Sequence, residues 1–217
     1  GSVMYSYQMN FPKGTNGVAP QVRMTYNSQS TKQNPTVMST GWKLSKSYIQ
    51  RDTNYTFDNV SNDNFKLIFN DASYDLVYDS SESRFYTEIE NFMHIENKSN
   101  GNNTKGEYWV VRTKDGTSYR FGYNNDSESV SNLQDYVWRW HLDVINDTYG
   151  NGVSYTYLEN PFQNDTGATY LDKIEYNDDK KRKIDFDDIT INFYNEFVSY
   201  LYNIMVTFNQ PLQVTFN

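Results

Sequence analysis

Residues 138–157, WRWHLDVINDTYGNGVSYTY, constrain the fold most strongly, because apolar and polar side chains alternate along two runs that flank one turn. In the first run, one face carries four apolar residues: Trp138, Trp140, Leu142 and Val144. The other face carries three polar residues: Arg139, His141 and Asp143. Alternation with a period of two is typical of a half-buried β-strand. We therefore predict a strand with an apolar face and a polar face.

The second run repeats the pattern after residues 146–152 and completes a hairpin. Val153, Tyr155 and Tyr157 alternate with Ser154 and Thr156. The connection contains Asp147, Gly150 and Asn151, which are residue types that favour turns and positive φ. We assign these three residues to turn geometry, and Trp138, Trp140, Tyr155 and Tyr157 to packing. Gly150→Val is expected to misfold the hairpin, because a β-branched residue resists positive φ.

Shorter alternating runs recur along the rest of the chain. The predicted strands lie within residues 5–11, 22–26, 65–69, 74–78, 85–87, 92–95, 109–111, 119–121, 174–176 and 184–186. Gly14 and Gly17 mark a turn, Asp115-Gly116 is a two-residue signal for a type I′ turn, and Trp42 is a packing residue. No segment shows a convincing amphipathic helix pattern, and residues 197–205 are the weakest exception. The predicted fold class is all-β, with antiparallel β-hairpins in a curved sheet and little or no helix.

Composition supports this class and excludes several functions. Aromatic residues reach 17% of the 217 residues, which favours pleated, half-buried surfaces. The formal net charge of −8 argues against a nucleic-acid partner. The absence of cysteine excludes disulfides and thiolate chemistry. No apolar run is long enough to predict a transmembrane helix, and no signal peptide is visible.

No catalytic set can be assembled from the sequence. The two histidines, His94 and His141, both lie in predicted strands and are better explained as sheet residues than as general bases. No nucleotide-binding or nucleophile motif is present. Pairs such as Asp178 and Asp179 leave a glycosidase as an alternative, which would need two carboxylates facing one cleft. We assign no catalytic residue and expect no enzymatic activity.

Two binding functions stay open. Residues 58–64 place oxygen ligands at alternating positions, which is a weak signal for calcium because the glycine and closing glutamate of an EF-hand loop are missing. We otherwise expect no cofactor and no metal. The density of Tyr and Trp also allows a carbohydrate- or receptor-binding β-sandwich of a bacterial surface protein.

Several motifs resemble one known family, the SpvB-type domain. The family pattern reads roughly PPG-x-NG-x-x-P, L-x-YNS, G-x-G-W-x-L and I-x-R. In this chain the corresponding segments are residues 11–20 (FPKGTNGVAP), 26–30 (YNSQS), 41–44 (GWKL) and 49–51 (IQR). Residues 115–122 and 138–157 continue the resemblance, and the latter is similar to a Rhs or YD repeat. Pro12-Lys13-Gly14 stands where the family often has Pro-Pro-Gly, and the match ends at Phe186.

The resemblance implies a structural role. Such domains open the B components of bacterial insecticidal toxin complexes, where they help to form a hollow shell of β-hairpins around a toxic polypeptide. In a Salmonella virulence protein the ADP-ribosyltransferase is a separate C-terminal domain, and nothing in this chain resembles it. The self-cleaving aspartyl site of Rhs shells belongs to a later segment.

We expect an SpvB-like β domain with YD-like hairpins at residues 3–186 and a C-terminal β segment at residues 187–217. The expected function is that of a non-catalytic shell domain of a secreted bacterial toxin. The expected partners are other toxin subunits or the rest of its own longer chain.

Overall fold

A computed structural model describes residues 1–32, 40–53, 63–131, 135–159, 169–176, 182–185, 187–188 and 202–203. The described residues form β-strands and short 3-10 helices with no α-helix, which confirms the all-β prediction. Most of the calcium segment at residues 58–64 and most of the weak helix candidate at residues 197–205 lie outside the described residues. No described helix is long and apolar enough to cross a membrane.

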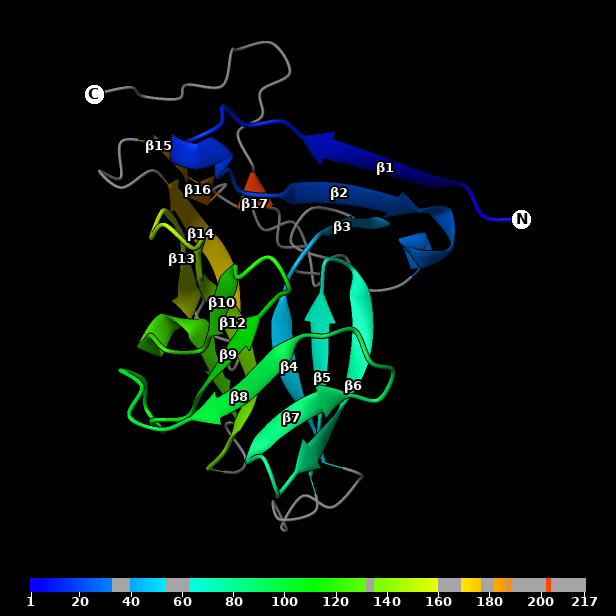
Figure 1. Cartoon of the computed structure of the whole chain (residues 1–217). Helices are drawn as coiled ribbons and strands as arrows, with labels where there is room; N and C mark the ends of the chain where they lie inside the picture. The colour runs from blue at the N-terminus through cyan, green and yellow to red at the C-terminus, as the bar shows by residue number, and fades with distance from the viewer. Residues whose placement is uncertain are drawn as a thin grey trace. The chain divides into compact units, whose positions relative to one another are not determined.

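The chain divides into two compact units, one of residues 1–45 and 172–217 and the other of residues 46–171 (Figure 1). In the first unit, β1 (Met4–Met9), β2 (Val22–Asn27) and β3 (Trp42–Leu44) form an antiparallel sheet in that order. Two 3-10 helices, η1 (Thr15–Gly17) and η2 (Ser28–Lys32), lie in its connections. The same unit holds β15 (Arg182–Asp185), which pairs with the end of β14 (Thr169–Tyr176), and the short pair β16 (Asp187–Asp188) and β17 (Tyr202–Asn203).

The second unit is built on a closed ring of antiparallel strands. Its members, in pairing order, are β10 (Ser118–Phe121), β9 (Tyr108–Arg112), β8 (His94–Lys98), β7 (Arg84–Thr87), β6 (Ala72–Asp79), β5 (Asn64–Phe69), β4 (Tyr48–Asp52) and β12 (Val137–Asn146). The ring closes because β12 pairs with β4 through residues 139–141 and with β10 through residues 142–146. Outside the ring, β11 (Glu128–Val130) and β13 (Gly152–Glu159) also pair with β12.

The apolar residues of the predicted alternating pattern fill the inside of this ring. Residues that pair across strands share a face, as Ile49 does with Leu67 and Ile95 with Val111. Seven of the largest core side chains have no exposed surface: Ile49, Leu67, Ile95, Trp109, Val111, Phe121 and Trp140. Burying each such side chain is worth about 1.5–3 kcal/mol. The apolar face of each strand therefore points into the ring and stabilises it.

Strand β12 departs from the predicted alternation. Its register against β10 shifts so that Arg120 pairs with Val144 and Phe121 with Leu142, which leaves Asp143 as an extra residue. A second shift against β11 skips Trp138. Because a bulge moves the following side chains to the opposite face, the prediction that Val144 and Trp138 share a face with Trp140 and Leu142 is wrong.

The expectation of a half-buried strand is also wrong at the centre of β12. His141 and Asp143 are only 2% and 0% exposed, so both faces of the strand are buried here. The residues that contact this outer face come from β11, β13 and the 3-10 helix η4 (Asn125–Ser127). These elements cannot be placed over the strand from the local pattern alone.

The type I′ turn occurs at a different place from the predicted one. At Asp115-Gly116 only the glycine has positive φ, and strand pairing stops at Arg112 and Ser118, so the connection is longer than two residues. Asn70 and Asp71 both have positive φ, between the paired residues Phe69 and Ala72. That is the geometry of a type I′ hairpin, and Asn and Asp are the non-glycine residues that tolerate it best.

Candidate functional site

Asp143 is a structural carboxylate on the outer face of β12. It accepts a hydrogen bond from Arg120 Nε at 2.8 Å and others from the backbone N–H groups of Tyr123 and Asn124 at 2.8 and 3.1 Å. Burial raises the pKa of the Asp143 carboxyl, and the Arg120 guanidinium opposes the rise. All the contacts of this carboxylate hold the chain of residues 120–127 against β12, so it is committed to the fold.

His141 is likewise enclosed. Its Nε2 lies 3.0 Å from the Ser129 hydroxyl, and its ring packs on Tyr157 with the centroids 5.0 Å apart. Burial lowers the pKa of His141 well below its usual value, and the nearby charges of Lys46 and Arg139 lower it further. The imidazole is therefore neutral near pH 7 and is held as a packing group.

The predicted turn residues at the end of β12 form one hydrogen-bonded unit. The Asp147 carboxylate accepts hydrogen bonds from the backbone N–H groups of Tyr149 and Asn151 at 2.9 and 2.8 Å, and from Asn151 Nδ2 at 2.7 Å. Gly150 has a φ of +87° and donates its N–H to the Asp147 carbonyl. These contacts place the three residues in the turn geometry that the sequence analysis assigned to them.

The remaining predicted residues lie in packing or turn positions across both units. Trp42 packs against Tyr26 at 5.3 Å between ring centroids, while Trp140 and Tyr155 are buried. Trp138 is half-buried beneath the Arg139 guanidinium, and the Tyr157 hydroxyl donates to the Leu142 carbonyl at 2.6 Å. Gly17 and Gly116 have positive φ, whereas Gly14 has a φ of −79° and precedes η1. None of these residues gathers into a site.

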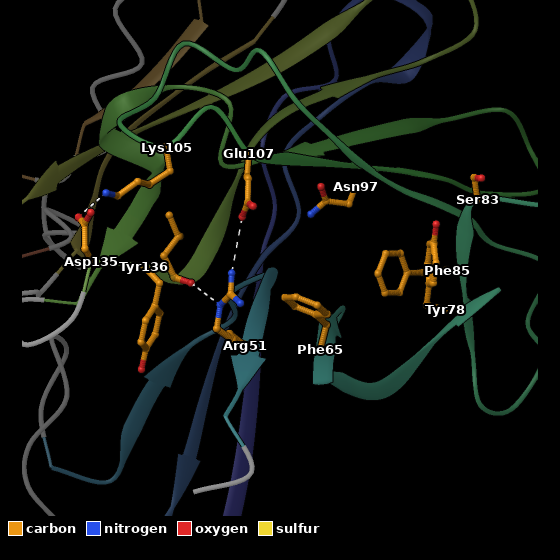
Figure 2. Close-up of a pocket in the computed structure, with 11 residues that line it drawn as sticks. Arg51, Phe65, Tyr78, Ser83, Phe85, Asn97, Lys105, Glu107, Asp135 and Tyr136 are labelled. Atoms are coloured by element: carbon orange, nitrogen blue, oxygen red, sulfur yellow. Dashed lines mark hydrogen bonds and ion pairs between the residues drawn. The ribbon is translucent and has the colours of Figure 1, made fainter. Parts of the chain in front are cut away.

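A pocket of about 620 Å³ lies elsewhere, at one end of the closed ring (Figure 2). Residues near the ends of β4, β6 and β8 line it: Arg51, Tyr78 and Asn97. Residues near the starts of β5, β7 and β12 also line it: Phe65, Phe85 and Val137. Because neighbouring strands run in opposite directions, these alternating ends meet at the same end of the ring. The pocket belongs entirely to the unit of residues 46–171.

Aromatic rings form one side of this pocket, and they appear together on the right of Figure 2. Tyr78 and Phe85 are cross-strand partners with centroids 4.9 Å apart, and Phe65 lies 5.7 Å from Phe85. The buried Trp109 ring packs with its centroid 4.9 Å from that of Phe65 and 4.8 Å from that of Phe85. The buried indole holds the phenyl rings in place, so this side is a fixed apolar surface.

Charged side chains form the opposite side. Arg51 donates to the Val137 carbonyl and to the Asp63 carboxylate, each at 2.9 Å, and lies over the Phe65, Tyr136 and Trp140 rings. Its Nη2 is 3.6 Å from Glu107 Oε2. Lys105 pairs with Asp135 (Figure 2). The Arg51 guanidinium is therefore fixed by contacts on several sides. It contacts Glu107, whose side chain lines the pocket.

None of these pocket residues is recognisable as part of a site from the sequence. Phe65, Tyr78 and Phe85 were identified only as alternating strand residues, which is what they are locally. Arg51 belongs to residues 49–51 (IQR), which resemble a motif of the SpvB-type family. Nothing in the local pattern shows that strand ends separated by up to 86 residues meet, as Arg51 and Val137 do.

Other described residues offer little for catalysis or metal binding. Among them, no group of three or more histidine, cysteine or acidic side chains could hold a metal ion. His94 Nδ1 lies 2.7 Å from Arg84 Nη1, and its Nε2 is 3.6 Å from Glu96. No described histidine therefore stands beside a hydroxyl nucleophile in an open cleft.

Comparison with known proteins identifies one matching family and solved toxin structures with a similar fold. The SpvB family, described as Salmonella virulence plasmid 65kDa B protein, matches residues 1–205. Among solved structures, the TcdB2-TccC3 crystal structure has a TM-score of 0.61 at 17% identity, covering 81% of this chain and 10% of that one. The Photorhabdus luminescens Tc holotoxin pore has a TM-score of 0.58 at 17% identity, covering 80% of this chain and 9% of that one.

A third structure, the N-terminal domain of the effector SpvB from Salmonella typhimurium strain LT2, has a TM-score of 0.56 at 16% identity. The match covers 78% of this chain and 63% of that one. The chain thus spans about a tenth of the toxin-complex chains that it resembles. A comparison with curated proteins finds no match.

Proposed function

Because the chain belongs to the SpvB family, we propose that it is a non-catalytic structural domain of a secreted bacterial toxin. In this role it forms part of a shell wall, with hairpins in a Rhs/YD-like arrangement, that encloses or presents a toxic polypeptide. Its partners are then other toxin subunits or the rest of its own longer chain. The domain shares its fold with segments of the TcdB2-TccC3 and Tc holotoxin chains, and this relationship motivates the proposal.

The observation that best supports a structural role is the use of the buried polar groups. Asp143 holds the segment of residues 120–127, His141 packs between Ser129 and Tyr157, and Arg51 holds β4 against β12 through the Val137 carbonyl. Catalytic carboxylates and histidines instead need access to a substrate. A buried network of this kind stiffens a wall rather than supplying a reaction.

Protection of the enclosed polypeptide tests the proposal. The natural full-length protein is treated with a broad-specificity protease, and survival of the polypeptide that follows this domain is followed over time. We expect the Trp140→Ala variant to lose that protection at least tenfold faster than the wild type, because removing a fully buried tryptophan costs about 3–5 kcal/mol. Tyr149→Ala is the matched control, since this side chain is 80% exposed.

Equal protection in the wild type and in a protein lacking residues 1–205 would contradict an enclosing role. The non-catalytic part is tested separately, by incubating the domain with glycan and dinucleotide substrates. Turnover that disappears in Glu107→Gln or His141→Gln would show an enzyme instead.

A further inference from the structure

The pocket at the end of the ring shares Arg51 and Val137 with the structural network, but the rest of its lining has a distinct chemical character. One side is a fixed set of aromatic rings, the opposite side presents charged groups, and Asn97 adds an amide to the lining. A volume of about 620 Å³ lies within the range of small-molecule sites, about 300–1,000 Å³. Its ligand can therefore be inferred from the groups that it offers.

The aromatic side offers a surface for an apolar face of a ligand. Tyr78 remains 54% exposed even though it is a ring-strand residue paired with Phe85. The Tyr78 ring packs on Phe85, which in turn packs on the buried Trp109, so it loses little conformational entropy when a ligand packs on it.

The charges of the lining cancel, which excludes strongly ionic ligands. Arg51 and Lys105 contribute two positive charges, and Glu107 and Asp135 contribute two negative charges. Each cation already contacts a carboxylate, as Arg51 does with Asp63 and Lys105 with Asp135. A phosphate or nucleotide would need unpaired cations, so the pocket suits a neutral ligand.

Two polar side chains of the lining, Asn97 and Glu107, are available for hydroxyl groups. The side-chain amide of Asn97 has no hydrogen-bond partner among the described residues, and it can both donate and accept. The Glu107 side chain is 48% exposed and contacts only the Arg51 guanidinium within the described part of the chain. Together they offer acceptors and donors near the aromatic rings.

We propose that this pocket binds a neutral carbohydrate, with an apolar sugar face on Tyr78 and Phe85 and ring hydroxyls on Asn97 and Glu107. A neutral sugar has both an apolar face of C–H groups and a set of hydroxyls, which is the combination that the two sides of the pocket complement. The site is independent of the shell role, since neither Tyr78 nor Asn97 takes part in the buried network.

A glycan array probed with the labelled 217-residue chain identifies the ligand, and titration calorimetry with the strongest glycan measures its affinity. We expect Tyr78→Ala and Asn97→Ala each to weaken binding at least tenfold. Tyr78→Phe keeps the ring and should restore binding to within about threefold of the wild type. Tyr149→Ala removes an exposed tyrosine from the turn after β12 and should leave binding unchanged.

Thermal unfolding of each variant separates lost binding from lost folding, because Tyr78 and Asn97 are exposed and their removal should leave Tm within about 2 °C of the wild type. No bound glycan on the array, or equal weakening by Tyr149→Ala and Tyr78→Ala, would overturn the proposal. So would a binding signal carried only by anionic glycans and abolished by salt. Each of these results leaves the shell proposal standing, since protease protection is a separate measurement.

Discussion

At the scale of single residues, the outer face of β12 shows how polar groups can be buried for structure. Asp143 has no exposed surface and receives its hydrogen bonds from Arg120 and from backbone N–H groups. The charge is tolerated because each donor offsets part of the cost of removing it from water. Its loss takes away the acceptor that Arg120 and the Tyr123 and Asn124 N–H groups share.

The first prediction follows from this burial. Asp143→Ala is expected to lower the free energy of unfolding by about 3–5 kcal/mol, as for other broken buried ion pairs. Urea denaturation measures the change. Asp75→Ala is the matched control, because its carboxylate is 59% exposed and its ion pair with Lys66 should be worth less than about 1 kcal/mol. Similar losses in the two variants would contradict the structural role of Asp143.

The second prediction concerns pH and His141. The folded protein keeps this imidazole neutral, with Lys46, Arg139, Ser129, Tyr48 and Tyr157 around it. Its pKa is lowered below the usual 6.5, so the unfolded chain takes up a proton at a higher pH than the folded chain. The free energy of unfolding should therefore fall as the pH drops below about 6.5.

A His141→Gln variant isolates this contribution. Glu159 acts in the opposite direction, because burial raises its pKa to about 7 and its protonation favours the folded state as the pH falls. The difference between wild type and His141→Gln, measured by urea denaturation from pH 7.5 to 5, removes the Glu159 contribution. We expect the wild type to lose more stability than the variant, and parallel curves would refute the prediction.

At the scale of elements, two glycines separate backbone strain from steric overlap. Gly150 has a φ of +87°, and an added Cβ would meet nothing within 4 Å. Gly122 has a φ of +70°, and an added Cβ would lie 2.2 Å from Trp140 Cδ1. The first position needs glycine only for its conformation, while the second also needs space beside a buried indole.

The third prediction compares alanine at these two positions. Gly150→Ala should cost about 1–2 kcal/mol, the strain of a left-handed residue. Gly122→Ala should cost a further 1–3 kcal/mol or so, because the extra methyl overpacks the core against Trp140. Thermal and urea unfolding measure both, and equal costs would show that the Gly122 contact relaxes freely. Gly150→Val tests in the same way whether the hairpin misfolds.

At the scale of the whole unit, the strand pairs of the ring differ in how many residues they join. The pair β7 and β8 shares only one register pair, Phe85 with Ile95, whereas β4 and β5 share five, from Tyr48–Ile68 to Asp52–Asn64. Fewer ladder hydrogen bonds mean a lower free energy for local opening. The pair β7 and β8 also lies beside the pocket, whose lining includes Phe85 and Asn97.

The fourth prediction places the first opening of the ring there. Hydrogen exchange measured by NMR should show that the least protected amides of β7 and β8 exchange at least tenfold faster than those at the centre of β5, around Leu67. A bound ligand that contacts Phe85 and Asn97 should slow this exchange. Uniform protection around the ring would show that all strand pairs open together in global unfolding.

The sequence by itself determined the local structure of this protein. Alternation with a period of two predicted the strands, Gly, Asn and Asp marked the turns, and ordered motifs such as residues 115–122 and 138–157 indicated the SpvB-type family that the comparison then established. These features depend on residues close together in the chain, so they can be read without knowing where the strands go.

Only the tertiary structure decided which strands pair, which faces are covered and where the pocket lies. The bulge at Asp143 reverses the faces of the end of β12, and residues from β11 and β13 bury His141. The pocket joins Arg51 to Val137 and Tyr78 to Phe85 at one end of the closed ring. Such contacts arise from pairing between strands far apart in the sequence, and the pattern within one strand does not determine its partner or register. The candidate binding site therefore cannot be identified without the tertiary structure.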